Sequence, residues 1–143
     1  LHDTLGLAGS GGVLEILARL LAGEALDAMP QPAKGVTYAE KLQKSEAALD
    51  FSLDAATLAR RVRAFDPFPG ATMHLPGIEL PVKVWGALAV DAVQGAAPGT
   101  LVRATPEGID IATADGVLRI VALQKAGGRR QTVAQFMQGW SAP

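Results

Sequence analysis

Residues 51–70 have the sequence FSLDAATLARRVRAFDPFPG, and the rest of the chain is expected to be organised around them. Their apolar residues recur at steps of three and four, which is the spacing of one face of an α-helix: Ala55, Leu58, Val62 and Phe65. Ser52 can cap the start of this helix, and Asp54 then lies in its first turn. Pro67 ends it, because proline cannot continue a helix. The stretch therefore predicts an amphipathic helix.

The polar face of the same helix carries arginine. At about 100° per residue, Arg60 and Arg63 fall opposite Leu58, and Arg61 falls on the flank. The segments before and after the helix are expected to pack on its apolar face. The function of the chain then depends on what this arginine face contacts.

After residue 70 the sequence changes to short strand-like pieces separated by Pro-Gly turns. The expected strands cover residues 71–75, 78–90, 101–104, 109–114 and 117–123. Asp115-Gly116 is a two-residue hairpin signal. Residues 132–138 are expected to form a last helical turn that packs Val133, Phe136 and Met137. Five short strands with one amphipathic helix predict a mainly β fold, a small OB-like β-barrel.

An isolated apolar helix is expected ahead of this barrel. Apolar residues at helical spacing run from Val13 to Leu21 and stop near Gly23. The glycines at 9–12 are interpreted as a loop entering the helix. A phosphate cradle is the weaker interpretation, because no strand precedes them and the Gly-Lys-Ser/Thr ending is missing. Residues 24–36 contain two prolines and a glycine, which predicts an extended linker.

Composition excludes several classes of site. The chain has 143 residues and 49% hydrophobic content, enough for a domain with a real core. It has no cysteine and two histidines, His2 and His74, so thiolate chemistry and a histidine-rich metal centre are excluded. No apolar run is expected to reach the roughly 20 residues of a membrane helix, and nothing suggests export. We expect a cytoplasmic protein without a membrane partner.

The positive charges are clustered although the net charge is only −1. Three clusters hold most of them: Lys34, Lys41 and Lys44; Arg60, Arg61 and Arg63; Lys125, Arg129 and Arg130. A phosphate responds to the charge within about one Debye length, roughly 8–10 Å, so clustering matters more than the sum. These side chains either are simply solvated or contact phosphates, for which the arginine fork is suited. The second interpretation predicts backbone contacts to folded RNA.

No catalytic set is evident in the sequence. His74 lies in an expected strand and has no serine or cysteine partner in a known motif, so a structural role is favoured. The start and stop of the helix explain the carboxylates around it: Asp50, Asp54 and Asp66. Trp85 and Trp140 are isolated and form no stacking platform at the spacing of RNA-binding sheets. The chain alone is expected to be inactive.

Several motifs resemble those of the methionyl-tRNA formyltransferase family, and they occur in the family's order. They are TYAEKL at 37–42, RAFDPFPGA at 63–71, PVKVW at 81–85, APGT at 97–100, IAT at 111–113 with DG at 115–116, and LQ at 123–124 ahead of GGRR at 127–130. The opening LHD and the apolar helix after it resemble the end of that family's catalytic domain. The resemblance covers nearly the whole chain.

The resemblance implies a fragment of an enzyme that moves a formyl group from 10-formyltetrahydrofolate to the amino group of initiator methionyl-tRNA. The family's Asn-His-Asp set and Ser-Leu-Leu-Pro motif have no counterpart here, so they would lie in a missing N-terminal catalytic domain in cis. Residues 1–23 would be the last helix of that domain, residues 24–44 the linker, and residues 45–143 the C-terminal β-barrel that holds tRNA. No cofactor is expected within the fragment itself.

The predicted RNA-binding residues come from two sources. Lys41 and Lys44 fall in the matching linker motif, and Arg129-Arg130 in the matching basic loop, residues 125–130. The helix arginines are assigned by geometry. The full set is Lys41, Lys44, Arg60, Arg61, Arg63, Lys125, Arg129 and Arg130.

Two alternatives remain open. One is the barrel of a related sugar-nucleotide formyltransferase or formyltetrahydrofolate dehydrogenase, which needs no contact with tRNA. The other is a structural module that docks a catalytic partner through Leu14, Leu17 and Leu21. The tRNA interpretation is preferred because the motifs match in order and the basic clusters lie where that function needs them.

Overall fold

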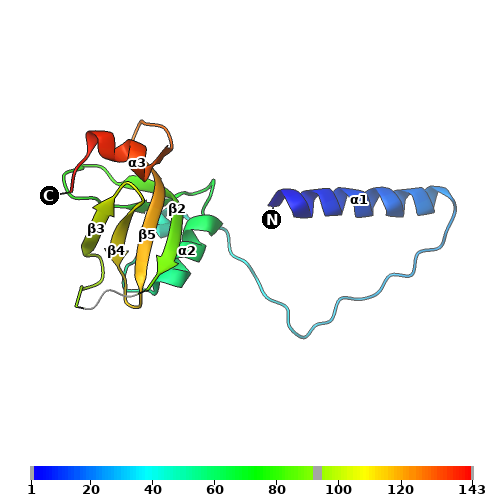
Figure 1. Ribbon diagram of the computed structural model, residues 1–143. Helices are drawn as coiled ribbons and strands as arrows, with labels where there is room; N and C mark the ends of the chain where they lie inside the picture. Colours follow the sequence, from blue (N-terminus) through cyan, green and yellow to red (C-terminus); the bar gives the residue numbers. More distant parts are fainter. Residues whose placement is uncertain (1, 92–94, 143) are drawn as a thin grey trace. The chain divides into compact units, whose positions relative to one another are not determined.

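The computed structural model describes residues 2–91 and 95–142, in two units, Leu1–Ala39 and Glu40–Pro143. Leu1 and Pro143, which begin the first predicted domain and end the last one, lie outside the described residues. The first unit contains helix α1 (His2–Leu21), and the second contains all the strands (Figure 1). The predicted domain boundaries stay a prediction.

Helix α1 begins eleven residues earlier than the apolar pattern from Val13 indicated, with His2 rather than Val13 as its first residue. The prediction of a loop at residues 9–12 is therefore wrong, since these glycines lie inside the helix. Glycine costs about 1 kcal/mol against alanine in a helix, but Leu7 and Ala8 before these glycines and Leu14 after them favour the helix. The Ser10 hydroxyl also donates to the Leu7 carbonyl oxygen one turn earlier (2.9 Å).

The expectation about membrane-helix length is also corrected. By length and composition, α1 is long and apolar enough to cross a membrane. The small residues between its leucines are not polar enough to interrupt the apolar segment. Signal sequences and core helices of water-soluble proteins have the same length and composition, so this property alone assigns no membrane.

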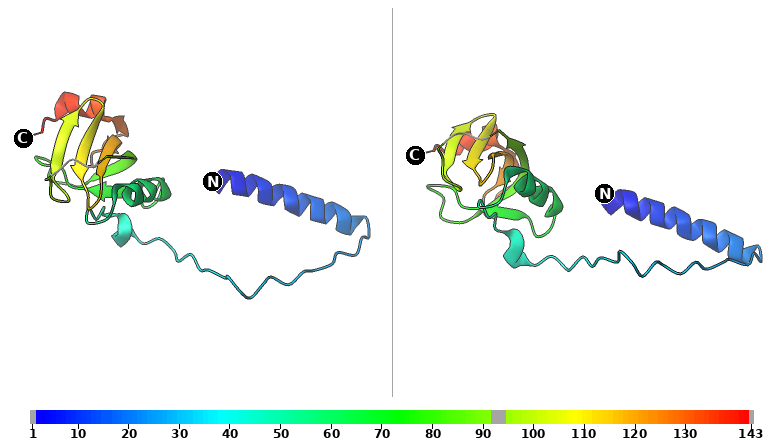
Figure 2. Two further views of the ribbon diagram at one scale, coloured as in Figure 1. Left: turned by 60° about the horizontal axis from the view of Figure 1, so that its bottom comes forward. Right: turned by 90° about the horizontal axis from the view of Figure 1, so that it is seen from below.

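The second unit is built on one antiparallel sheet, as the mainly β prediction required. Its strands are β1 (Ala71–Met73), β2 (Val82–Val90), β3 (Leu101–Thr105), β4 (Gly108–Ala112), β5 (Val117–Gln124) and β6 (Gln131–Thr132). The order is β1-β2-β5-β4-β3, and β6 pairs with β5. In the described part of the chain β1 and β3 are sheet edges, so this OB-like sheet is curved but not closed (Figure 2). The first two strands are shorter than expected because Pro76 and Pro81 lack the N–H that a ladder needs.

Helix α2 (Ala55–Ala64) is the predicted amphipathic helix, and it packs against β2 and β5. Its N-cap is Asp54, whose side chain accepts a hydrogen bond from the Thr57 backbone N–H (2.7 Å). The prediction that Ser52 caps the helix is therefore wrong. Ser52 instead donates through its hydroxyl to Asp50 Oδ1 (2.7 Å), which makes a tight turn ahead of the helix.

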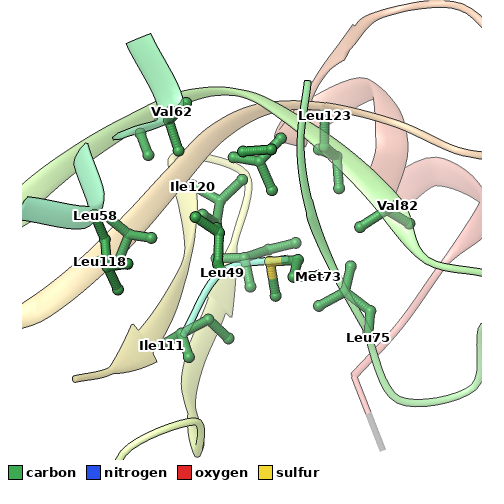
Figure 3. Close-up of a cluster of buried hydrophobic side chains, with 14 of the residues drawn as sticks. Leu49, Leu58, Val62, Met73, Leu75, Val82, Ile111, Leu118, Ile120 and Leu123 are labelled. Carbon is green, nitrogen blue, oxygen red and sulfur yellow. The ribbon is translucent and has the colours of Figure 1, made fainter. Parts of the chain in front are cut away.

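The core lies between α2 and the sheet. Figure 3 shows apolar side chains from α2 and from the strands pointing toward one another. The fully buried ones include Leu58, Val62, Val82, Val84, Ile109, Leu118, Ile120 and Leu123. All four apolar residues of the predicted helix face, from Ala55 to Phe65, are buried. The helical pattern was therefore interpreted correctly.

Short helical turns lie near the N-terminal and C-terminal ends of the second unit. The turn η1 (Lys44–Ala47) precedes the core residue Leu49, and α3 (Val133–Phe136) runs into η2 (Met137–Gly139). Val133 and Phe136 are buried, which confirms the predicted last turn. Trp140 lies 5.4 Å from Phe136 between ring centroids, and its indole N–H donates to the Pro76 carbonyl oxygen (2.9 Å).

Gly116 lies in the β4–β5 turn, where this turn packs against the start of α2. The predicted turn at Asp115-Gly116 is part of a longer connection, residues 113–116, and the Ala55 N–H donates to the Asp115 carbonyl oxygen (2.9 Å). Gly116 has φ +86°, and a Cβ there would lie 3.0 Å from the Val90 carbonyl oxygen and 3.2 Å from the Ala55 Cβ. Alanine is therefore both strained and obstructed at this position.

We expect Gly116→Ala to lower the free energy of unfolding by about 1–3 kcal/mol, measured by urea denaturation. Gly77→Ala is the matched control, because Gly77 has φ +74° but open space around its Cα. It shares the backbone strain without the contacts. Equal losses in the two variants would contradict the role assigned to the Val90 and Ala55 contacts.

Candidate nucleic-acid interface

Among the predicted RNA-binding residues, Arg130 contacts both an acid and an aromatic ring. Its guanidinium makes a bidentate ion pair with Asp66, with Nη2 2.6 Å from Oδ1 and Nη1 3.1 Å from Oδ2. The same guanidinium lies over the Trp85 ring, 3.7 Å from its centroid. Asp66 follows the C-terminal end of α2, and Arg130 immediately precedes β6. One side chain therefore links the helix, strand β2 and the basic loop.

The basic loop, residues 125–130, is held by a short chain of hydrogen bonds. The Trp85 indole N–H donates to Gln124 Oε1 (2.8 Å), and Gln124 Nε2 donates to the Gly128 carbonyl oxygen (2.7 Å). Within the loop the Gly128 N–H donates to the Lys125 carbonyl oxygen (3.0 Å). A loop fixed in this way loses less conformational entropy when it binds a ligand.

The arginines of α2 lie as the helical geometry predicted. Arg60 and Arg63 are exposed, and Arg61 is half-buried with its guanidinium 5.5 Å from the Phe65 centroid. Arg60 also donates to the Thr57 hydroxyl (2.7 Å). Arg61 and Arg63 occupy the last turn of the helix, next in sequence to Asp66. The Asp66–Arg130 pair thereby connects the chain just after the α2 arginines to the basic loop.

The remaining predicted residues are more scattered. The Lys125 ammonium lies 4.9 Å from the Phe136 ring centroid and 3.5 Å from the Gly139 carbonyl oxygen, so it faces the C-terminal turn. Arg129, Lys41 and Lys44 are exposed, and in residues 2–91 and 95–142 their side chains have no hydrogen bond or ion pair. Within the described residues, therefore, no hydrogen bond or ion pair of the Lys41 or Lys44 side chain links it to the other two clusters.

Three residues of this surface were missed from the sequence: Asp66, Lys83 and Trp85. Asp66 was interpreted as a helix stop, and Trp85 as isolated. The Lys83 ammonium in fact lies 5.4 Å from the Trp85 centroid. The motif PVKVW could have indicated this contact, because Lys83 and Trp85 are two positions apart and residues at that spacing on a strand share one face.

The described residues offer no evident catalytic centre. Among them no group of three His, Asp or Glu side chains is placed to hold a metal ion. His74 follows β1 and borders a depression of about 390 Å³, whose residues in that part of the chain include no carboxylate.

A second ionic cluster lies on β3, β4 and β5. Asp110 is 5% exposed, and Arg119 donates to both its carboxylate oxygens, from Nε to Oδ1 (2.7 Å) and from Nη2 to Oδ2 (2.8 Å). Arg103 donates to Oδ2 as well (3.0 Å). The hydrogen bonds from Arg119 lower the pKa of Asp110, burial opposes them, and Arg103 lowers the pKa further. The two arginines satisfy this carboxylate, so we assign the cluster to stability.

The lowered pKa of Asp110 predicts how stability depends on pH. The charged carboxylate stabilises the fold above its ordinary pKa of 3.8, and this contribution is lost as pH falls through the lowered folded-state value. We expect Asp110→Asn to cost roughly 1–3 kcal/mol of unfolding free energy at pH 7, and much less near pH 2. Urea denaturation at both pH values measures the difference. Asp91→Asn, at an exposed carboxylate, is the control; a cost for Asp110→Asn that does not change with pH would contradict the assignment.

Comparison with known proteins identifies close sequence relatives. Residues 41–141 match the family described as formyl transferase, C-terminal domain. The chain is 60% identical over 143 residues to the methionyl-tRNA formyltransferase of Bordetella petrii, covering 100% of this chain and 44% of the relative. The enzyme of the same name from Bordetella parapertussis is 58% identical over 140 residues, with 98% and 45% covered. The chain thus spans less than half the length of these relatives.

A solved structure has a similar fold. The crystal structure of HypX from Aquifex aeolicus in complex with tetrahydrofolic acid matches with a TM-score of 0.61 and 25% sequence identity. The match covers 92% of this chain and 23% of HypX.

Proposed function

The chain belongs to the formyl transferase C-terminal domain family, and on that basis we propose that it is the tRNA-holding part of a methionyl-tRNA formyltransferase. The observation that carries the proposal is the 60% identity over all 143 residues to the Bordetella petrii enzyme. The match to HypX in complex with tetrahydrofolic acid is at a lower identity, 25%. A sugar-nucleotide formyltransferase or formyltetrahydrofolate dehydrogenase is therefore the weaker alternative.

The whole protein would act in translation initiation in the cytoplasm, moving a formyl group from 10-formyltetrahydrofolate to the amino group of initiator methionyl-tRNA. The tetrahydrofolic acid in the HypX complex supports a folate-linked donor. The present residues do not fit a formyl-transfer centre of the Asn-His-Asp kind, because the chain contains no asparagine. We therefore assign the chemistry to a catalytic domain outside these 143 residues.

The tRNA would be held through its phosphates by the eight lysines and arginines predicted from the sequence. Asp66 and Trp85 fix the Arg130 guanidinium, and the basic loop places Arg129 beside it in sequence. Arginine donors suit phosphate oxygens, and such contacts recognise the shape of a folded RNA more than its sequence. The net charge of −1 adds no long-range attraction, so this local cluster has to supply it.

A docking role for α1 is a second candidate, which is compatible with the first. Leu14, Leu17 and Leu21 are 68%, 49% and 89% exposed. An apolar helix face of this kind is typical of a surface that another part of the protein covers. Changing all three to glutamine should then lower formylation by a whole enzyme without altering tRNA binding by the chain.

A chimera tests the proposed function. This chain replaces the matching region of the Bordetella petrii enzyme, and formylation of methionyl-tRNA is measured with 10-formyltetrahydrofolate as the donor. We expect the chimera to formylate methionyl-tRNA and the 143-residue chain alone to be inactive. A chimera that folds, by circular dichroism, but transfers no formyl group would overturn the proposal.

A further inference from the structure

A depression of about 380 Å³ lies across β1, β2 and the end of β5, next to the basic loop. Its lining residues include Thr72, Leu80, Pro81, Lys83, Lys125 and Gly127. The depression of about 390 Å³ beside His74 shares Thr72 and Pro81 with it. The two depressions therefore adjoin, and we call them together the β1 groove.

The first depression of the β1 groove combines positive charge with apolar surface. Two lysines, Lys83 and Lys125, belong to its lining, and the described lining includes no acidic side chain. Leu80, in the same lining, is 57% exposed and supplies apolar surface. The Arg130 guanidinium lies close by, on the same Trp85 ring as the Lys83 ammonium. This combination suits a ligand that is anionic along one edge and flat and apolar along another.

We propose that the β1 groove binds an unpaired segment of RNA, with phosphates near Lys83 and a base against Leu80 and Pro81. This inference rests on the proposed function and deepens it, because it says which part of the RNA meets this groove. A paired base is stacked inside its helix, so a duplex offers the groove only phosphates. An unpaired base is free to leave the stack and to cover Leu80.

The experiment compares three RNA probes with matched leucine variants of the 143-residue chain. The probes are initiator tRNA, an unstructured oligouridylate and a blunt RNA duplex, and affinity is measured by fluorescence anisotropy. Leu80→Gln removes the apolar wall of the groove, and Leu88→Gln is the control, since Leu88 is 54% exposed and lies toward the far end of β2. We expect Leu80→Gln to weaken oligouridylate binding about fivefold, with duplex binding unchanged and Leu88→Gln without effect.

The other outcomes separate the two proposals. If the chain binds tRNA but Leu80→Gln and Leu88→Gln bind oligouridylate equally well, the groove proposal fails and the tRNA-holding function stands. The groove proposal also fails if Leu80→Gln weakens duplex and oligouridylate binding alike. If the unchanged chain binds no tRNA, both proposals fail. Thermal unfolding of the two variants checks that each is folded, which their exposure favours.

Discussion

Changing both Arg129 and Arg130 to alanine is expected to weaken binding of the chain to initiator tRNA roughly 10- to 100-fold near 0.1 M salt. Each phosphate contact near that salt concentration is worth on the order of tenfold, through the counterion that it releases. The slope of log affinity against log salt should become smaller by about two. Loss of Arg130 also leaves the Asp66 carboxylate without its ion-pair partner on the interface, which adds repulsion.

The control for this double variant removes the same charge elsewhere. Arg19 is paired with Glu24, and Arg103 with Asp110. The pair of substitutions Arg19→Ala and Arg103→Ala lowers the net charge by the same two units, and we expect little change in tRNA affinity. Equal weakening in the two double variants would mean that total charge, and not the basic loop, governs binding.

The largest loss of stability is expected from Leu58→Ala. Leu58 is fully buried, at 0% exposure, on the face of α2 that meets β2 and β5. Truncation to alanine loses buried apolar surface and leaves a cavity, which costs about 2–5 kcal/mol of unfolding free energy. Chemical denaturation followed by circular dichroism measures this loss.

Leu88→Ala is the matched control for the core variant, because Leu88 is 54% exposed on β2. Its cost should stay within about 0.5 kcal/mol. A small loss in both variants would show that α2 does not organise the core, and it would refute the role given to residues 51–70.

Helix α2 and strands β1 to β5 could be predicted because their signals are local, whereas the two-residue strand β6 was missed. The apolar spacing of α2 and the Pro-Gly turns between strands depend on neighbours in sequence. The errors came where two local signals competed. Ser52 and Asp54 are both good N-cap residues, and Asp50 decided between them by accepting the Ser52 hydroxyl. In α1 the glycines indicated a loop, yet the apolar residues around them continued the helix.

The contacts of the candidate interface were beyond the sequence for a different reason. Clustering showed which arginines and lysines to consider, but their partners come from distant segments. Asp66 and Arg130 are 64 positions apart, and Trp85 and Gln124 are 39 apart. Only the folded sheet reveals that an acid interpreted as a helix stop fixes a cation of the basic loop. The β1 groove likewise needs β1, the β1–β2 connection and the basic loop together.

Binding of the 143-residue chain to initiator tRNA across a salt series is the decisive test of a tRNA-holding role. A linear single-stranded RNA of equal length serves as the comparison. We expect an affinity that falls steeply and linearly on a log–log plot as salt rises, and tighter binding of the folded tRNA. Absence of tRNA binding even at low salt, or an affinity that does not change with salt, would contradict the tRNA-holding role.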